Sequence, residues 1–226
     1  MPAVDAPDAE QHPRDDDPAA GASVATAAAS RLAEPGLVLV SGPAGSGRSH
    51  VLHRVAAAFR GPVYSGGGLS MLRATPGLAL ARAVRAKLPT HDVALCAEAV
   101  RSRVRGGLLV IDDLQWCDPV TLAVLPRVAE HCRVLAALRT PHRLPETISS
   151  GLTAGALTLD IPPIGDAAAT ALVRHLAPGL AEPAVKNLVR RGGGSPLVLA
   201  CLARHAQQHP EAGPTDPAST TPDAVH

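Results

Sequence analysis

Residues 42–49, Gly42-Pro43-Ala44-Gly45-Ser46-Gly47-Arg48-Ser49, decide how the rest of the sequence is interpreted. They follow an apolar run at 37–40 that is typical of a buried strand, and they open a segment at 49–60 with helical spacing. The stretch fits the phosphate-loop pattern G-x-x-x-x-G-K-[ST], with Arg48 in place of lysine. This relaxed pattern is weak alone, but a strand before it and a helix after it are the context that it needs. The alternative is an ordinary Gly-rich turn.

The spacing of the glycines in this loop has a chemical reason. Glycine lets successive backbone N–H groups face inward and bind an anion, and the N-terminal end of the next helix adds positive potential. We therefore expect all residues of the loop, together with His50, to contact the phosphates of ATP or ADP. The hydroxyl of Ser49 is expected to ligate Mg²⁺.

Arg48 is a departure with consequences for chemistry. Lysine is a compact charge, whereas arginine is longer, planar and more demanding in geometry. Binding of a diphosphate through backbone amides is expected to survive the change, while positioning of the γ-phosphate for cleavage is expected to suffer. Since Lys87 and Lys186 are the only lysines in the chain, the replacement can also reflect a general preference for arginine.

A second motif, GGLLVIDDLQWCD at 106–118, has the form of a Walker B strand. We expect it to adjoin the strand that leads into the phosphate loop and to end beside that loop, with Asp112 holding Mg²⁺ through water and Asp113 orienting the attacking water. The C-terminal edge of a parallel sheet is where such folds place ligands. The alternative for the two aspartates is a helix-capping pair. Asp118 and Pro119 are interpreted as the N-cap and first residue of the next helix.

The remaining pattern predicts an α/β fold, a P-loop NTPase with a mostly parallel sheet flanked by helices. Short apolar strands, among them 108–112 and 133–139, alternate with helical segments, among them one from about 118 to 131, up to Pro163, and only helical spacing follows it. Residues 1–21 and 207–226 lack bulky apolar side chains and are expected to be disordered. The division is therefore a tail at 1–21, a core at 22–163, a helical lid at 164–206 and a tail at 207–226.

Composition excludes several classes of protein. No apolar run is long enough to span a membrane and no secretory signal opens the chain, so we expect a cytoplasmic protein without a membrane partner. Four scattered cysteines are expected to be reduced. Residues 35–206 carry a formal charge of +9 between ends of −5 and −3. A basic core could attract nucleic acid. The sequence has no Lys/Arg block and no interleaved aromatics, however, so we do not expect direct DNA binding.

Four strings together resemble the ATPase domain of STAND-type signalling NTPases, especially the large ATP-binding regulators of the LuxR family. They are GPAGSGRS (42–49), LLVIDDLQWCD (108–118), RVLAALRT (133–140) and GGGSPLVL (192–199). The resemblance implies that Arg139 senses the γ-phosphate and that Gly194 and Pro196 touch the base or sugar. The alternatives are a surface arginine at a strand end and a plain helix-start turn. Those regulators continue into a C-terminal helix-turn-helix, which is not expected here.

The resemblance and the motifs lead to a regulatory switch that binds ATP or ADP and hydrolyses ATP weakly or not at all. The alternative is a non-catalytic pseudo-ATPase that scaffolds a protein partner, and a weaker third hypothesis is a nucleic-acid accessory ATPase. A protein partner is expected in either of the first two cases. The oligomeric state is left open.

Overall fold

The structure is a computed structural model that describes residues 20–208, and its centre is a five-stranded sheet. All neighbouring strands are parallel, in the order β2-β3-β4-β1-β5. The strands are β1 (Gly36–Gly42), β2 (Val63–Gly67), β3 (Leu108–Asp112), β4 (Arg133–Arg139) and β5 (Ala156–Asp160). The predicted α/β class with a parallel sheet is confirmed.

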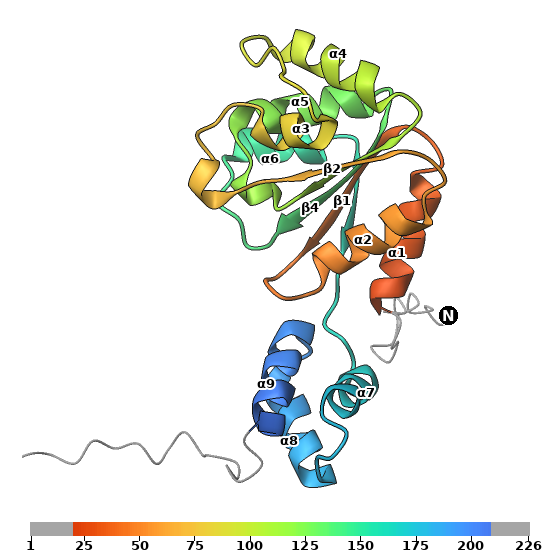
Figure 1. Cartoon of the computed structure of the whole chain (residues 1–226), viewed down its shortest axis with the longest axis vertical. Helices are drawn as coiled ribbons and strands as arrows, with labels where there is room; N and C mark the ends of the chain where they lie inside the picture. Colours follow the sequence, from red (N-terminus) through yellow and green to blue (C-terminus); the bar gives the residue numbers. More distant parts are fainter. Residues whose placement is uncertain (1–19, 209–226) are drawn as a thin grey trace, which may run out of the picture.

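Each face of the sheet is covered by its own helices, because alternate strand residues point to opposite faces. On one face Val38, Val110 and Leu135 pack with α1 (Ala20–Arg31) and α2 (Arg48–Ala58). The opposite face carries the larger core and is covered by four helices (Figure 1), namely α3 (Leu78–Val84), α4 (Val93–Val104), α5 (Pro119–Ala129) and α6 (Glu146–Thr153). Both faces of the sheet are therefore buried, which explains the uninterrupted apolar runs in the sequence.

The elements agree with the sequence pattern apart from a few ends. β3 and β4 have the expected bounds, and the helices after the phosphate loop and after Asp118 differ by one or two residues. The helix α6 was not expected, and the short 3₁₀ turns η1 (Ser70–Leu72) and η2 (Leu114–Trp116) were not either. Single-turn elements carry too few residues for a periodic signal, and α6 contains Ser149, Ser150 and Gly151, which obscure one.

One expectation about the sheet needs correction. The strand that ends in Asp112 was expected to adjoin the strand that leads into the phosphate loop, but β4 lies between β3 and β1. The two strand ends still face the same edge, because all strands run parallel. The strand that adjoins β1 in its place is β4, whose last residue, Arg139, is in register with Gly42.

A separate helical unit follows the sheet and has its own core. It consists of α7 (Asp166–Leu176), α8 (Glu182–Gly192) and α9 (Pro196–Gln208), and it lies at the carboxyl edge of the strands (Figure 1). Val173, Val185 and Leu199 are at the centre of its apolar cluster. The helices α1 and α9 include Ala20, Gly21, Gln207 and Gln208, which were assigned to the tails; the rest of both predicted tails lies outside the described residues.

Among the described residues, 20–208, no helix combines the length and the apolar character that crossing a bilayer would need.

Candidate nucleotide site

Several backbone N–H groups of the loop between β1 and α2 form no hydrogen bond with the rest of the described protein. Gly45 and Gly47 adopt positive φ angles of 78° and 95°, a backbone conformation that glycine takes readily. Ser46 N–H donates to Pro43 O at 3.3 Å. Within residues 20–208, no protein acceptor is found for the N–H groups of Gly45, Gly47, Arg48 and Ser49. A strand, a glycine turn and a helix N-terminus thus present unpaired donors together, which is the arrangement that binds an anion.

Two buried side-chain atoms in the same loop lack partners. The Ser46 hydroxyl and Arg48 Nε are buried, and neither forms a hydrogen bond with any described residue. Buried polar groups in proteins are almost always paired, and each unpaired one costs about 1–3 kcal/mol. These orphans fit a site whose missing partner is an anionic ligand.

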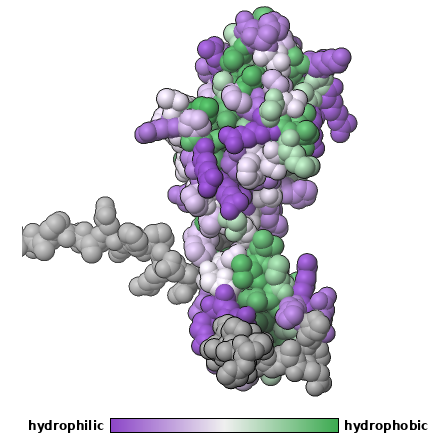
Figure 2. All heavy atoms as spheres, turned by 90° about the vertical axis from the view of Figure 1, so that its left-hand side faces the viewer, coloured by the Kyte–Doolittle hydropathy of each residue, from purple (hydrophilic) through white to green (hydrophobic). Residues whose placement is uncertain are grey.

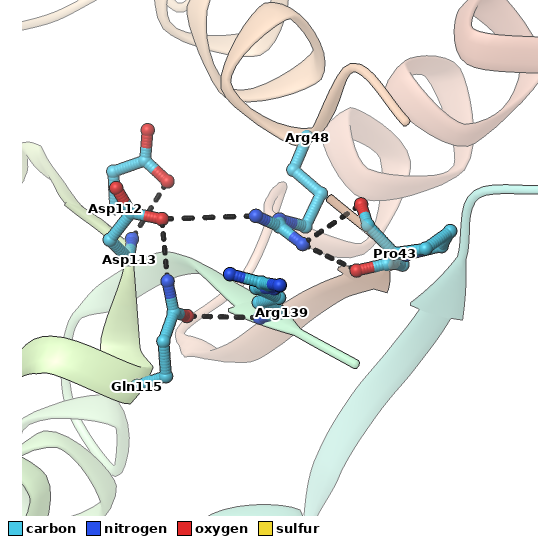
Figure 3. A network of polar contacts seen from close by, with 7 residues as sticks. Pro43, Arg48, Asp112, Asp113, Gln115 and Arg139 are labelled. Atoms are coloured by element: carbon cyan, nitrogen blue, oxygen red, sulfur yellow. Dashed lines mark hydrogen bonds and ion pairs between the residues drawn. The ribbon is translucent and has the colours of Figure 1, made fainter. Parts of the chain in front are cut away.

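Arg48 folds back over its own loop. Its Nη1 donates to the carbonyl oxygens of Gly42 and, at 3.1 Å, of Pro43, while its Nη2 lies 3.8 Å from Asp113 Oδ1 (Figure 3). The side chain is only 10% exposed. Burial lowers the pKa of Arg48; the carboxylates of Asp113 and Asp112 oppose this, and Arg139 adds to it. The guanidinium therefore lies between the phosphate loop and the end of β3.

The end of β3 is a tight turn built on an unusual backbone conformation. Asp113 has φ 52° and ψ 51°, a left-handed conformation that Asp tolerates better than most residues. Its N–H donates to the carboxylate of Asp112 at 2.7 Å, and its carbonyl accepts from Trp116 N–H at 2.9 Å. Of the two aspartates, Asp113 forms the ion pair with Arg48. Its left-handed conformation turns it away from the direction of the strand.

Glycines from the neighbouring strand make room for this turn. Gly68 follows β2, and a Cβ atom there would lie 2.5 Å from Asp113 O and 2.6 Å from the Trp116 carbonyl carbon. Gly68 N–H also donates to Asp112 O at 3.0 Å. Gly68 was not among the predicted site residues. The run Gly66-Gly67-Gly68 at a strand end was the signal for such a close approach.

Gln115 connects Asp113 to the end of β4. Its Nε2 donates to Asp113 Oδ1 at 2.7 Å, and its Oε1 accepts from Arg139 N–H at 3.0 Å (Figure 3). The side chain of Gln115 is buried. The sequence did not single out Gln115 within its motif. Its partner Arg139 lies on another strand, and such a distant hydrogen bond leaves no pattern in the local sequence.

Arg139 lies at the sheet edge beside the loop. It pairs in register with Gly42, and its side chain is exposed. The next residue, Thr140, donates its N–H to Gly42 O at 2.9 Å. Among the described residues, the Arg139 guanidinium has neither a hydrogen bond nor an ion pair, so it is free to meet a ligand.

The helical unit touches the phosphate loop directly. Leu197 N–H donates to Gly45 O at 3.3 Å, and Ser195 Oγ lies 3.5 Å from the same carbonyl. Gly194 packs against the linker, where its carbonyl accepts from Ile164 N–H at 3.0 Å. The segment 194–196 therefore comes together with the loop, but through Gly45 and the linker.

The oxygen donors expected to hold a magnesium ion have suitable chemistry. Ser49 is exposed in the first turn of α2, and Asp112 is half-buried with one carboxylate oxygen left unbonded. Mg²⁺ prefers hard oxygen ligands and is usually held by one or two side chains together with phosphate and water. No group of three or more His, Cys, Asp or Glu capable of holding a metal occurs in residues 20–208. His50 is exposed one residue beyond Ser49.

Two residues next to the loop were missed by sequence reasoning. Ser41, the residue before Gly42, donates its hydroxyl to Asp160 at the end of β5. The carbonyl of Ser41 also accepts from Ile161 N–H at 2.8 Å. These bonds fix the carboxyl end of β1 to the edge strand.

Comparison with known proteins bears on the fold. No family model matches the chain, and no curated protein does. The RuvB Holliday junction branch migration motor of Thermotoga maritima aligns over 83% of this chain and 59% of its own, at 16% identity and a TM-score of 0.53. Domain III of the Thermotoga maritima replication initiation protein DnaA aligns over 79% and 78%, at 14% identity and a TM-score of 0.53.

These similarities agree with the strand order, the loop position and the helices on both faces. The chain has the AAA+ P-loop NTPase fold. A crystallised DNA replication initiation factor shows the same likeness at 12% identity, with a TM-score of 0.53. The chain spans about 60% of the length of the RuvB structures that it matches. In this AAA+ fold, the residues 42–49, 112–115 and 139 meet at the carboxyl edge of the sheet.

Proposed function

We propose that this protein is a regulatory switch that binds ATP or ADP and has weak or absent ATP hydrolysis. The observation that carries the proposal is the loop itself. Its open amides, together with the buried and unpartnered Ser46 hydroxyl and Arg48 Nε, form a site that an anionic group would complete. The AAA+ fold is consistent with a nucleotide as the source of that anion.

The proposed roles of the other residues follow from their positions. Ser49 and Asp112 hold Mg²⁺, and this ion supplies positive charge beside the phosphates. Asp113 orients water at the terminal phosphate. Arg139, free at the end of β4, senses that phosphate, while Gly194 and Pro196 lie at the base or sugar and His50 at the helix start.

The helical unit α7–α9 acts as a lid in this proposal. Its contact with Gly45 means that a ligand filling the loop changes the surface on which Leu197 rests. The resemblance to STAND and LuxR-type ATPase domains favours a switch over a motor, with output through a protein partner.

Weak hydrolysis is proposed because of Arg48. Its guanidinium is committed to two loop carbonyls and to Asp113, the residue proposed to orient water. While these contacts hold, the guanidinium is not available to a γ-phosphate. Positioning of the γ-phosphate also relies on a cation geometry that the planar arginine reproduces poorly.

A non-catalytic scaffold is the second candidate, and one surface favours it. Leu197 and Val198 of α9 are 57% and 42% exposed, and apolar surface is visible on the helical unit in Figure 2. Exposed apolar surface beside a ligand site is typical of a protein-binding site. In this case bound ADP would hold the helical unit in the form that the partner recognises.

Nucleotide binding is tested by thermal-shift titration with ATP, ADP and AMP, each with and without Mg²⁺. A ligand at about 100 times its dissociation constant adds about 2.7 kcal/mol of stability, which moves the midpoint by several degrees. A shift with ADP and ATP but not AMP is expected. No shift with any nucleotide would exclude the proposal, and a shift without turnover would favour the scaffold.

DNA binding is tested in parallel because the similar structures are of proteins named for DNA transactions. We expect weak association with a steep dependence on salt only if the basic core contacts phosphates. A flat salt dependence, or no association, is the result expected here.

A further inference from the structure

We propose that Gln115 is a positioning residue that fixes Asp113 relative to the terminal phosphate of a bound nucleotide, an inference that rests on the function proposed above. Nothing in the sequence pattern distinguishes Gln115 from a solvent-exposed glutamine. Its environment does, because it is buried and both ends of its amide are used. When one buried amide forms hydrogen bonds with two separate elements, it fixes the distance between those elements.

The side chain of Gln115 has the chemistry that such a bridge needs. An amide has a donor and an acceptor end, and here they serve different strand ends. The donor reaches Asp113 Oδ1 at 2.7 Å, and the acceptor receives Arg139 N–H at 3.0 Å. Asp113 is in a left-handed turn outside the strand, and the side chains that contact its carboxylate are Gln115 and, at 3.8 Å, Arg48.

These bonds close a ring of contacts across three elements (Figure 3). From Asp113 the path runs through Gln115 to Arg139, and the neighbouring Thr140 N–H donates to Gly42 O. Gly42 O also accepts from Arg48, and Arg48 returns to Asp113 at 3.8 Å. Phosphate loop, β3 end and β4 end therefore share one network.

A phosphate bound in the loop changes this ring. Arg48 has an unpartnered buried Nε and turns toward an anion at the cost of its contacts with Gly42 and Asp113. Asp113 then loses its cationic neighbour. Gln115 is the remaining side chain that holds Asp113 Oδ1, so the carboxylate stays directed at the phosphate instead of turning into solvent.

Gln115→Met tests the proposal, since methionine keeps the length of glutamine and removes both hydrogen-bonding ends. The measurement is the dissociation constant of ATP and of ADP in excess Mg²⁺ for the wild type and the variant. We expect the affinity for ATP to fall about tenfold and that for ADP by less than about twofold, because an Asp113 carboxylate released from Gln115 competes with the terminal phosphate for Arg48. Gln207→Met on the exposed end of α9 is the matched control.

A double-mutant cycle separates positioning from a purely structural role. The side chains of Arg48 and Gln115 do not contact each other in this network, so independent effects should add. We expect Arg48→Lys and Gln115→Met to be non-additive in ATP affinity, because both act on Asp113. Additive effects would assign Gln115 to the fold alone.

Gln115→Glu keeps the test informative if the methionine variant folds poorly. The introduced carboxylate still accepts Arg139 N–H, but it cannot donate to Asp113 and repels it. We therefore expect the ATP-to-ADP affinity ratio of this variant to fall as it does in Gln115→Met, since both substitutions remove the bond that holds Asp113 Oδ1.

The outcomes are distinct. Wild-type protein that binds neither nucleotide would overturn both proposals. Wild-type binding, with an ATP-to-ADP affinity ratio unchanged in Gln115→Met and in Gln115→Glu, would overturn the positioning role while leaving the nucleotide site intact.

Discussion

At the scale of single residues, Arg48 determines what the site can do. A positive charge is present where a phosphate loop needs one, but it is bound to Gly42 O, Pro43 O and Asp113. A flexible ammonium would contact a γ-phosphate with less geometric demand than the planar guanidinium. In the proposed function, the substitution is therefore expected to allow nucleotide binding and to slow turnover.

Arg48→Lys is expected to raise ATP turnover by about tenfold, which corresponds to about 1.4 kcal/mol of activation free energy. The physical reason is release of Asp113 from the guanidinium and better contact with the terminal phosphate. Phosphate release is the measurement, and Arg54→Lys, on an exposed face of the same helix, is the control. Equal background rates in wild type, Arg48→Lys and Asp113→Ala would show that no hydrolysis occurs at this site.

Cysteine reactivity is also decided residue by residue. Cys96, Cys117 and Cys132 are buried, whereas Cys201 is exposed on α9. Burial raises the pKa of Cys117 to about 12, and the carboxylates of Asp118, Asp113 and Asp112 act in the same direction. Since the thiolate is the reactive form, Cys117 is almost fully protonated at pH 8.

In the native protein we expect one thiol, that of Cys201, to react rapidly with a disulfide reagent at pH 8. All four cysteines of the chain should react after denaturation. Cys201→Ser should abolish the rapid phase, and a rapid phase that persists in this variant would contradict the burial of the other three.

At the scale of elements, the turn after β3 and the start of α5 are held by Asp118. Its Oδ1 accepts from Thr121 N–H at 3.0 Å as an N-cap, and also from Gly77 N–H at 2.8 Å. The second bond joins α5 to the start of α3, 41 residues earlier in the chain. The N-cap was predicted from Asp118-Pro119, whereas the bond to Gly77 follows from the packing of two helices.

Asp118→Ala is expected to lower the free energy of unfolding by about 2–4 kcal/mol, because a cap is lost and a buried N–H is left unpaired. Chemical denaturation measures this change. Asp166→Ala, at an exposed first-turn position of α7, should cost less than about 1 kcal/mol. Similar losses for the two variants would mean that the bond to Gly77 contributes nothing.

At the scale of the whole molecule, the helical unit contacts the phosphate loop at Gly45, whose carbonyl accepts from Leu197 N–H. A Cβ atom on Gly45 would lie 2.7 Å from Leu197 Cβ. The loop is thus both the proposed phosphate site and the seat of the helical unit. In the proposed switch, a ligand that alters the loop would act on the position of α9 directly, through the contact between Gly45 and Leu197.

Gly45→Ala is expected to separate the two units, and faster exchange of the Leu197 amide in the absence of nucleotide is the measurement. Gly106→Ala is the matched control, because Gly106 also has a positive φ, of 74°, but nothing within 4 Å of the added Cβ. Both variants should lose about 1–2 kcal/mol of stability from backbone strain. Only Gly45→Ala should expose Leu197, and equal exchange in both would show that the contact is not formed.

Much of the fold was predictable because its signals are local. Apolar runs of strand length, helical periodicity and the glycine spacing at 42–49 each depend on a few consecutive residues, and each reappears in the structure with nearly the same bounds. The motif order along the chain was enough to predict a parallel α/β sheet. Strand order was not predictable in this way, and β4 lies where β3 was expected.

By itself, then, the sequence determined which residues build the loop, the strands and the acidic strand end, because backbone preference and hydropathy act over short distances. Only the tertiary structure decided what those residues touch. The approach of Gly68 to the turn at Asp113, the bond between Gln115 and Arg139, and the contact of Leu197 with Gly45 all join segments distant in sequence. Such contacts arise from packing of the assembled sheet, where the carboxyl ends of parallel strands converge at one edge.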